Sequence, residues 1–385
     1  MQTIDQTGTS LLASAVAAGL VAAGRADEAE QDRRLHPEVA EALVGAGFAR
    51  HLVPARWGGT AGGYAELAEA VAVVGEGCAS AGWCAAVYAI AGRIGAHLPL
   101  AGQEELWGDG PDVLIASGIV PAPGAGVESV PGGGWRLTGE WPFSSGVGSA
   151  SWVVVGALVG ADGGGREFRF FAVPQGSFTV RRTWANVGLG GTGSDTVVLS
   201  DVFVPGHRTF RYDALLRGEA VGSTAVVHTV PYKLVNGLMF VSPALGAARG
   251  ALRHWTEWIG SKYEMGGRPS RERGSVQEAL ARTSSELDLA GMLVARAADA
   301  ADLGDGSAET LARSPRDFAV TADLLTSATT RLLRAGGARA QTAANPVQRA
   351  WRDVHAAAGH VVLQFDAAAA GYAEQVFGTA PAARG

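Results

Sequence analysis

The chain has 385 residues, of which 47% are hydrophobic and 18% are charged, and its net charge at pH 7 is −6. This length exceeds that of a typical single domain, and the composition is that of a well-packed globular protein. The negative charge and the lack of a basic stripe exclude a general nucleic-acid binder. The sequence shows neither a signal peptide nor an apolar stretch long enough to span a bilayer, so we expect a cytoplasmic protein without a membrane partner.

Two stretches with different periodicity fill the first half of the chain. From Leu11 to about Trp107, apolar residues recur every three or four positions, which predicts helices with breaks at His36-Pro37 and Gly58-Gly59. Between about Val113 and Val204, glycine and proline cluster, and short runs such as Trp152-Val153-Val154-Val155 favour strands. The chain therefore turns from helical to β structure near residue 112.

The second half is first mixed and then helical. Residues 206–237 have no clear period and are typical of a linker over the surface, whereas residues 242–385 return to a helical period. This α, β, α order is uncommon and predicts an α+β fold. We expect an N-terminal α domain at 1–112, a central β domain at 113–212, and a linker with a C-terminal helical bundle at 213–385.

The two cysteines, Cys78 and Cys84, lie six positions apart in an apolar segment. Neither belongs to a pattern of cysteine and histidine with the spacing of metal ligands. We therefore expect reduced, buried thiols and no metal.

The run from Gly139 to Gly146 reads Gly-Glu-Trp-Pro-Phe-Ser-Ser-Gly and precedes an apolar stretch at 152–159. Its proline fixes φ and its small residues allow a close approach, which suits a turn between two strands beside a flat ligand. The two hydroxyls then lie at the edge of that ligand. A plain connection between strands, with aromatic side chains in the core, explains the same residues equally well.

A second glycine-rich run, at 188–193, contains the pattern Gly-x-Gly-Gly-x-Gly. A dinucleotide-binding loop needs a strand before it and a helix after it, but this run leads into Thr196-Val197-Val198-Leu199, which favours a strand. The run therefore predicts a tight turn beside the ligand pocket and not a nucleotide loop.

Four sequence blocks occur in an order that points to one family. They are Ser80-Ala81-Gly82-Trp83, Trp141 to Gly146, Gly188 to Asp195 running into Asp201-Val202-Phe203-Val204-Pro205, and Asn345 to His355 with His360 beyond it. Together they resemble the acyl-CoA dehydrogenase superfamily, and most closely its two-component flavin-dependent monooxygenases of the aromatic-hydroxylase type (group D). The resemblance implies a helical domain, a central β-barrel-like domain and a C-terminal four-helix bundle. It also implies a homotetramer with the flavin in the cleft between domains.

The block around Arg352-Asp353 separates the branches of that superfamily. Dehydrogenases often place a Glu-Gly pair after it as the catalytic base, but here the first acid downstream is Asp366, and His360 stands earlier. The resemblance thus implies a hydroxylase that takes reduced FMN or FAD from a separate reductase. It would form a C4a-hydroperoxide with O2 and hydroxylate an electron-rich, aromatic small molecule. Glu264 and Gly274 stand where dehydrogenases bind the diphosphate end of FAD, which leaves FMN open.

The same resemblance implies roles for single residues. Ser145 would hydrogen-bond the flavin N5 edge, and His360 would take a phenolic proton, since a neutral imidazole with a pKa of about 6.5 suits that task. Residues expected at the flavin are Trp83, Ser117, Phe143, Ser144, Ser145 and His360, and residues expected at the substrate are His97, in a helix after Trp83, and Thr192.

Two further polar groups in the last third of the chain read as structural. His355 precedes His360 by five residues on the same presumed helix, about 140° round, so we expect it to face elsewhere. Arg352-Asp353 reads as an ion pair that orients neighbouring elements.

Other functions remain open at this level. One is an acyl-CoA dehydrogenase-type desaturase that acts without oxygen, with its base on another helix. Another is a monooxygenase that oxidises nitrogen or sulfur, for which a base such as His360 is not needed. The last is a member that binds flavin without redox chemistry, because fold does not fix function.

Overall fold

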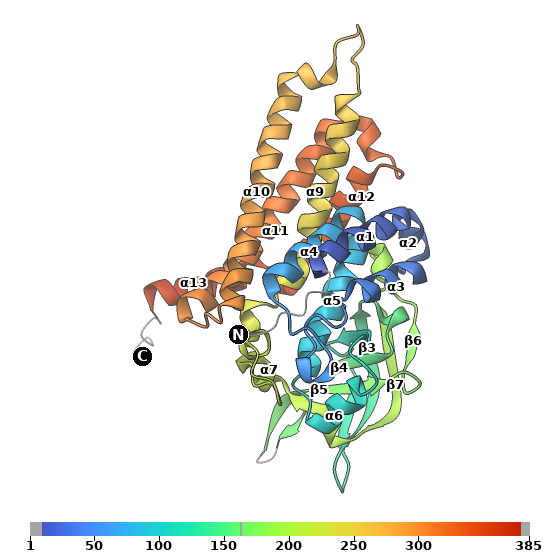
Figure 1. The fold of residues 1–385 in the computed structure, drawn as a ribbon, viewed down its shortest axis with the longest axis vertical. Coiled ribbons are helices and arrows are strands. Elements are labelled where there is room, and N and C mark those ends of the chain that lie inside the picture. Colours follow the sequence, from blue (N-terminus) through green and yellow to red (C-terminus); the bar gives the residue numbers. More distant parts are fainter. Residues whose placement is uncertain (1–9, 162–163, 379–385) are drawn as a thin grey trace, which may run out of the picture.

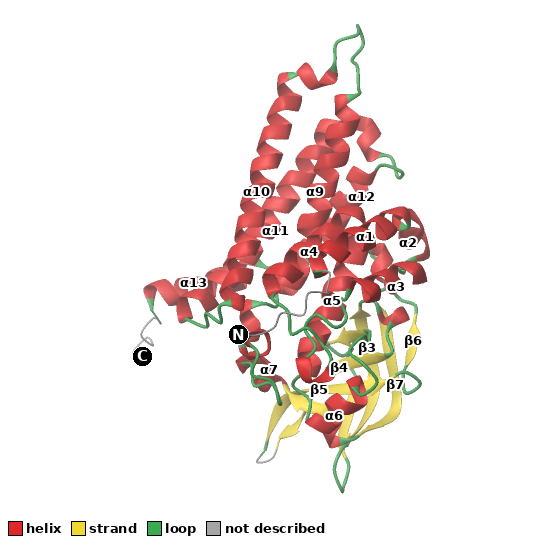
Figure 2. Ribbon diagram, in the orientation of Figure 1, coloured by secondary structure: helices red, strands yellow, loops and turns green. Residues whose placement is uncertain are grey.

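A computed structural model of the protein describes residues 10–161 and 164–378. A long helical bundle forms one end of the molecule and a β domain the other, with the N-terminal helices packed where the two meet (Figures 1 and 2). The helices are α1 Leu11–Gly24, α2 Ala26–Asp32, α3 Pro37–Ala46, α4 Tyr64–Gly77, α5 Ala79–Gly95, α6 Leu100–Trp107, α7 Tyr212–Arg217, α8 Val226–Thr229, α9 Leu238–Gly260, α10 Gly274–Asp302, α11 Ala308–Gly336, α12 Pro346–Ala358 and α13 Phe365–Phe377. The strands are β1 Ile115–Gly118, β2 Gly126–Ser129, β3 Trp135–Ser144, β4 Trp152–Ala161, β5 Gly165–Pro174, β6 Thr179–Arg181, β7 Asp195–Val204 and β8 Thr209–Arg211.

Local sequence sets several helix ends. Helix α3 begins at Pro37, whose fixed φ and missing N–H suit a first helical position, and the His36 ring accepts the N–H of Glu38. Helix α12 begins in the same way at Pro346, with the Asn345 side chain as its cap. The helix break predicted at His36-Pro37 is therefore confirmed.

The β domain consists of two four-stranded sheets in the orders β1-β4-β5-β8 and β2-β3-β7-β6. Only the pair β1 and β4 is parallel among the strands described. The two sheets share one buried apolar core that includes Trp141, Val153, Phe171 and Val197. The Trp141 indole is fully buried and donates its N–H to the carbonyl of Gly156, 2.8 Å away, so its one polar atom is satisfied.

The segment 206–237 differs from the linker expected of it. Residues Thr209–Arg211 form β8, which pairs antiparallel with β5 and completes the first sheet. The chain then forms α7 and α8 before it enters the bundle. The expectation failed because a three-residue strand is too short to show a period of two. The domain boundaries near 112 and 212 remain a prediction.

Helix α9 packs unusually close to α4, and this contact positions the site. A Cβ added to Gly246 in α9 would lie 2.0 Å from the carbonyl oxygen of Ala72 in α4, so only glycine allows the approach. Helix α5 follows α4 directly and also contacts α9. The close packing brings the first turn of α9 against the N-terminal half of α5, where Phe240 meets Trp83.

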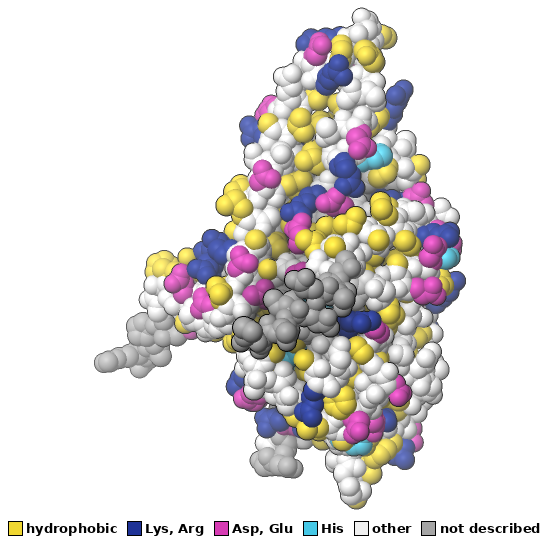
Figure 3. All heavy atoms as spheres, in the orientation of Figure 1, with side chains coloured by type: hydrophobic (Ala, Val, Ile, Leu, Met, Phe, Trp, Pro, Cys, Tyr) yellow, Lys and Arg dark blue, Asp and Glu magenta, His cyan; other side chains and the backbone are white. Residues whose placement is uncertain are grey.

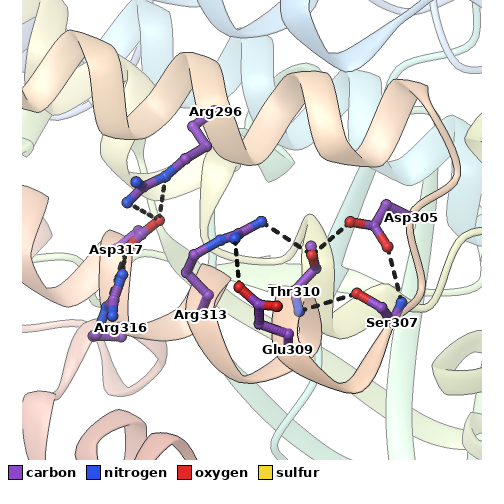
Figure 4. A network of polar contacts seen from close by, with 8 residues as sticks. All are labelled: Arg296, Asp305, Ser307, Glu309, Thr310, Arg313, Arg316 and Asp317. Atoms are coloured by element: carbon purple, nitrogen blue, oxygen red, sulfur yellow. Dashed lines mark hydrogen bonds and ion pairs between the residues drawn. The ribbon is translucent and has the colours of Figure 1, made fainter.

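The four-helix bundle of α9 to α12 confirms the predicted C-terminal architecture, and buried charge ties its helices together (Figure 4). Asp317 in α11 is 2% exposed and accepts hydrogen bonds from Arg296 in α10 at 2.6 Å and from Arg316 at 2.8 Å. The Arg316 guanidinium also lies 4.3 Å from the centre of the Tyr372 ring in α13. Asp317 therefore links three helices. Among the described helices, none is long and apolar enough to cross a membrane.

Candidate active site

The turn after β3 carries Ser145 to the place where α5, α9, α12 and the loop before β7 meet. The Ser145 hydroxyl accepts the indole N–H of Trp83 at 3.0 Å, and its oxygen lies 2.7 Å from the Ser194 hydroxyl. Trp83 is 8% exposed and Ser145 is equally buried. Two residues that the sequence predicts at the flavin therefore contact each other directly.

A chain of hydroxyl groups continues from Ser145 into the glycine-rich run. Ser194 Oγ lies 2.7 Å from Thr192 Oγ1, and Thr192 Oγ1 donates to the carbonyl of Leu189 at 2.8 Å. The run forms a short 3-10 helix, Gly190–Thr192, and leads into β7. The tight turn predicted there is confirmed, and it delivers Thr192 to Ser145.

The two residues before Ser145 point in different directions. Ser144 is fully buried and its hydroxyl donates to the carbonyl of Trp141 at 3.1 Å, so it faces the core. Phe143 is 71% exposed and has a φ of 61°, a left-handed conformation that non-glycine residues rarely adopt. Its ring meets Trp184 edge-on at 6.1 Å. Such strained residues cluster at ligand sites, which favours Phe143 as a contact of the flavin.

Ser117 lies in β1, half-buried, with its Cα paired to Val154. The next residue, Gly118, lies against the Ser144 hydroxyl and the Trp141 side chain. Strand β1 thus ends beside the turn that carries Ser145.

An aromatic wall closes the other side of the site. The His360 ring stacks on Phe240 with centres 3.7 Å apart and planes 25° apart, and it meets Trp83 edge-on at 6.2 Å. Burial lowers the pKa of His360 to about 4, because the apolar surroundings disfavour the charged ring. The imidazole is therefore neutral at pH 7.

His360 does not share a helix with His355, contrary to the expectation from sequence. Helix α12 ends at Ala358, and His360 follows in extended conformation, with its Nδ1 accepting the N–H of Val362 at 3.3 Å. The break occurs because Gly359 ends the helix. In this arrangement the neutral ring carries its proton on Nε2. His355 stays on the helix, with its ring 4.6 Å from the Trp351 ring at a tilt of 45°, and contacts Thr330, which suits the structural role predicted for it.

Arg352 and Asp353 hold the glycine-rich run and do not pair with each other. Asp353 accepts the N–H of Leu189 at 2.6 Å, and Arg352 donates to the carbonyl of Val187 at 2.7 Å. Burial raises the pKa of Asp353 to about 6. A Cβ on Gly188 would lie 2.2 Å from the Arg352 carbonyl oxygen, so glycine is needed for this contact. The scaffold role is as predicted, but Asp353 binds a backbone N–H, and Arg352 pairs with Glu30 and a backbone carbonyl instead of with Asp353.

His97 lies far from this group, contrary to the expectation that it reaches the substrate. Helix α5 ends at Gly95, about 18 Å along its axis from Trp83 at 1.5 Å per residue. His97 follows that end, 2% exposed, with its ring 5.6 Å from Phe210. Its Nδ1–H donates to the carbonyl of Arg93 at 3.1 Å.

Sequence reasoning missed two members of the site. Ser194 stands inside the quoted block from Gly188 to Asp195, so its place beside Thr192 was a signal in the sequence. Nothing in the sequence pointed to Phe240, because an aromatic residue in an apolar helix cannot be distinguished from an ordinary core residue by pattern alone.

The residues present suit a flavin. An isoalloxazine ring needs hydrogen-bonding groups at its edge and apolar groups at its faces. Ser145 offers a hydroxyl oxygen with a free lone pair, Phe143 an exposed ring in strained backbone, and His360 a neutral imidazole in an apolar wall. Ser145 would hold the N5 edge, Phe143 would lie against the ring, and Trp83 would stand behind Ser145. Within residues 10–161 and 164–378, no three His, Cys, Asp or Glu side chains are grouped so as to bind a metal.

Comparisons with known proteins agree with this geometry. Residues 238–365 match the family model described as acyl-CoA dehydrogenase, C-terminal domain. The chain is 34% identical over 370 residues to the flavin-dependent monooxygenase, oxygenase subunit HsaA, of Mycobacterium tuberculosis. The match covers 93% of this chain and 92% of that protein. It is 31% identical over 378 residues to the FADH(2)-dependent resorcinol hydroxylase, oxygenase component, of a Rhizobium species, with 92% and 91% covered.

Solved structures give the same result. The crystal structure of 3-HSA hydroxylase from Rhodococcus sp. RHA1 superposes with a TM-score of 0.90 at 30% identity, covering 97% of this chain and 98% of that one. XiaF from a Streptomyces species, in complex with FADH2 and glycerol, gives 0.88 at 28% identity, with 97% and 96% covered. The chain therefore belongs to the acyl-CoA dehydrogenase superfamily and, within it, to the oxygenase components of two-component flavin-dependent monooxygenases.

Proposed function

We propose that this monooxygenase hydroxylates an electron-rich aromatic small molecule, using reduced flavin that a separate reductase supplies. The observation that carries the proposal is the neutral His360 ring, held in an aromatic wall beside Trp83 and Ser145. The relative named as a resorcinol hydroxylase supports an aromatic substrate.

Each side chain then has a physical task. Bound reduced flavin supplies the two electrons that split O2, with one oxygen atom going to the substrate ring and the other leaving as water. Ser145 orients the N5 edge, and the apolar wall of Trp83 and Phe240 keeps water out of the site. His360 exchanges a proton with the phenolic oxygen. For Nε2 to accept that proton, the ring proton must first move to Nδ1, which breaks only the long 3.3 Å bond from Val362.

An apolar cavity of about 20 Å³, which is room for about one water molecule, lies between α4, α5 and α9. Ala86 lies one turn after Trp83 and Met239 is next to Phe240, so the cavity adjoins the aromatic wall. Its one hydroxyl without a hydrogen-bond partner among the described residues belongs to Ser242. We propose that the substrate ring binds at the aromatic wall between α5 and α9, beside this cavity and not inside it.

Exposed apolar side chains support a homotetramer. Helix α10 exposes Leu289 and Met292, and α13 exposes Val376 and Phe377, where Figure 3 shows apolar surface among charged groups. Apolar surface of this kind is typical of protein contacts. Light scattering after size exclusion tests the assembly. The choice between FMN and FAD and the cytoplasmic location remain predictions.

The decisive experiment uses isotopic oxygen. The purified protein, chemically reduced flavin and a panel of phenols are mixed without O2, and ¹⁸O2 is then added. We expect one ¹⁸O atom in a hydroxylated phenol and less hydrogen peroxide than without substrate. Peroxide alone, with all phenols recovered unchanged although flavin binds, would contradict the proposal. In a separate assay with oxidised flavin as the electron acceptor, oxidation of an acyl thioester without O2 would favour the desaturase instead.

A further inference from the structure

We propose that Thr192 and Ser194 are positioning residues that fix the direction of the Ser145 hydroxyl, so that its oxygen only accepts hydrogen bonds from the flavin. The site then favours reduced over oxidised flavin. This rests on the proposed function in one respect, namely that the N5 edge of the flavin faces Ser145.

The direction follows from counting protons. The Leu189 carbonyl has no proton to give, so the 2.8 Å contact with Thr192 Oγ1 uses the single hydroxyl proton of Thr192. The 2.7 Å contact between Thr192 and Ser194 must then use the proton of Ser194. The 2.7 Å contact between Ser194 and Ser145 must in turn use the proton of Ser145. The three protons all point away from the flavin side.

The carbonyl at the end of the chain is firmly held. Leu189 O also receives the indole N–H of Trp184 at 2.8 Å and the backbone N–H of Thr192 at 3.1 Å. The backbone N–H of Leu189 itself donates to Asp353. The acceptor that sets the direction of the chain therefore keeps its place.

Burial prevents the chain from reversing. Ser145 is 8% exposed, Ser194 4% and Thr192 1%, so water does not replace a lost partner. If the three hydroxyls donated in the opposite direction, Thr192 Oγ1 and the Leu189 carbonyl oxygen would lie 2.8 Å apart with no proton between them, which is costly in a buried site. At the other end, Trp83 donates its N–H to Ser145 and never accepts. Ser145 is thus left with one lone pair and no free proton.

The free lone pair of Ser145 distinguishes the reduced from the oxidised state of the flavin. The N5 atom of a reduced flavin carries a hydrogen and donates to Ser145, whereas N5 of an oxidised flavin is itself an acceptor and meets an oxygen that offers no proton. One hydrogen bond gained in only one redox state corresponds to about a tenfold difference in affinity.

The test measures dissociation constants for oxidised FMN and, without oxygen, for reduced FMN. In Thr192→Val the row of hydroxyls loses its fixed end, so Ser194 can donate its proton to Ser145. The Ser145 hydroxyl is then free to turn and donate to oxidised flavin. We expect this variant to bind oxidised FMN up to about tenfold tighter, with the affinity for reduced FMN unchanged. The midpoint potential of bound flavin falls correspondingly by about 30 mV. Ser194→Ala frees the same proton and gives the same gain, which covers the case in which one variant does not fold.

Two controls complete the design. Ser145→Ala loses the bond to reduced FMN and gains nothing with oxidised FMN. Thr183→Val removes a different hydroxyl pair, between Thr183 and Thr196 at 2.7 Å, and leaves both constants unchanged. A purely structural role of Thr192 and Ser194 would weaken the binding of both flavins, and unchanged or weaker binding of oxidised FMN in both variants overturns the inference. A protein that prefers reduced FMN in this way but transfers no ¹⁸O refutes the proposed function alone.

Discussion

His97 makes the folded protein sensitive to acid. Burial, and then the positive charge of Arg93, lower the pKa of His97 from 6.5 to about 4. Its Nδ1–H donates to the Arg93 carbonyl, and its Nε2 is buried without a partner among the described residues. The unfolded chain therefore binds a proton at His97 between pH 6.5 and pH 4, where the folded chain does not. The free energy of unfolding falls as the pH decreases through this window.

The size of the effect follows from the two pKa values. Lowering the pH from 7.5 to 5 costs about 2 kcal/mol of unfolding free energy at this one residue, at 1.36 kcal/mol for each pKa unit. His97→Asn removes the titration and keeps an N–H that reaches the Arg93 carbonyl. We expect the loss between pH 7.5 and pH 5 to be about 2 kcal/mol smaller in the variant.

Urea unfolding, followed by tryptophan fluorescence at both pH values, measures this difference. Histidines that do not interact with His97 contribute equally in both proteins and cancel; the exception is His228, whose charge also lowers the pKa of His97. His254→Asn, at a half-buried position on α9, is the matched control. A variant that loses as much stability as the wild type between the two pH values, within about 0.5 kcal/mol, refutes the reasoning about His97.

Three further outcomes are expected. His360→Ala and His360→Gln both slow hydroxylation by about 10²- to 10⁴-fold in kcat; near wild-type rates in the glutamine variant, which keeps an N–H donor, would show that no proton is accepted. Phe240→Leu removes the ring stacked on His360, so we expect the free energy of unfolding in urea to fall by about 1 kcal/mol. We also expect a lower kcat at unchanged reduced-flavin affinity, and an unchanged kcat would show that the Phe240–His360 contact has no part in catalysis. Asp317→Ala lowers the free energy of unfolding by about 1 to 2 kcal/mol, because Arg296 and Arg316 lose a buried partner but remain partly hydrated themselves. Glu309→Ala, at a side chain that is 73% exposed, changes it by about 0.5 kcal/mol or less, and equal effects would contradict the importance assigned to burial (Figure 4).

Much of the fold was predictable because its signals are local. The helical period, the caps at His36-Pro37 and the β-branched runs between Val113 and Val204 act over a few residues, and each predicted the structure that formed. The turn around Ser145 and the glycine-rich run were likewise predictable, since proline fixes φ and glycine permits backbone conformations that other residues rarely adopt. Short elements such as β8 escaped, because three residues show no period.

What the sequence by itself determined is thus the order of helical and β units and the residues at each turn. Only the tertiary structure decided which of those residues meet. Ser145 contacts Trp83 across 62 positions, and Leu189 contacts Asp353 across 164. Phe240 stacks on His360 because α9 packs against α12, which His360 follows. The direction of the hydroxyl chain likewise exists only once Thr192, Ser194 and Ser145 are buried together, because a hydrogen bond acquires a fixed direction from its neighbours and from the absence of water.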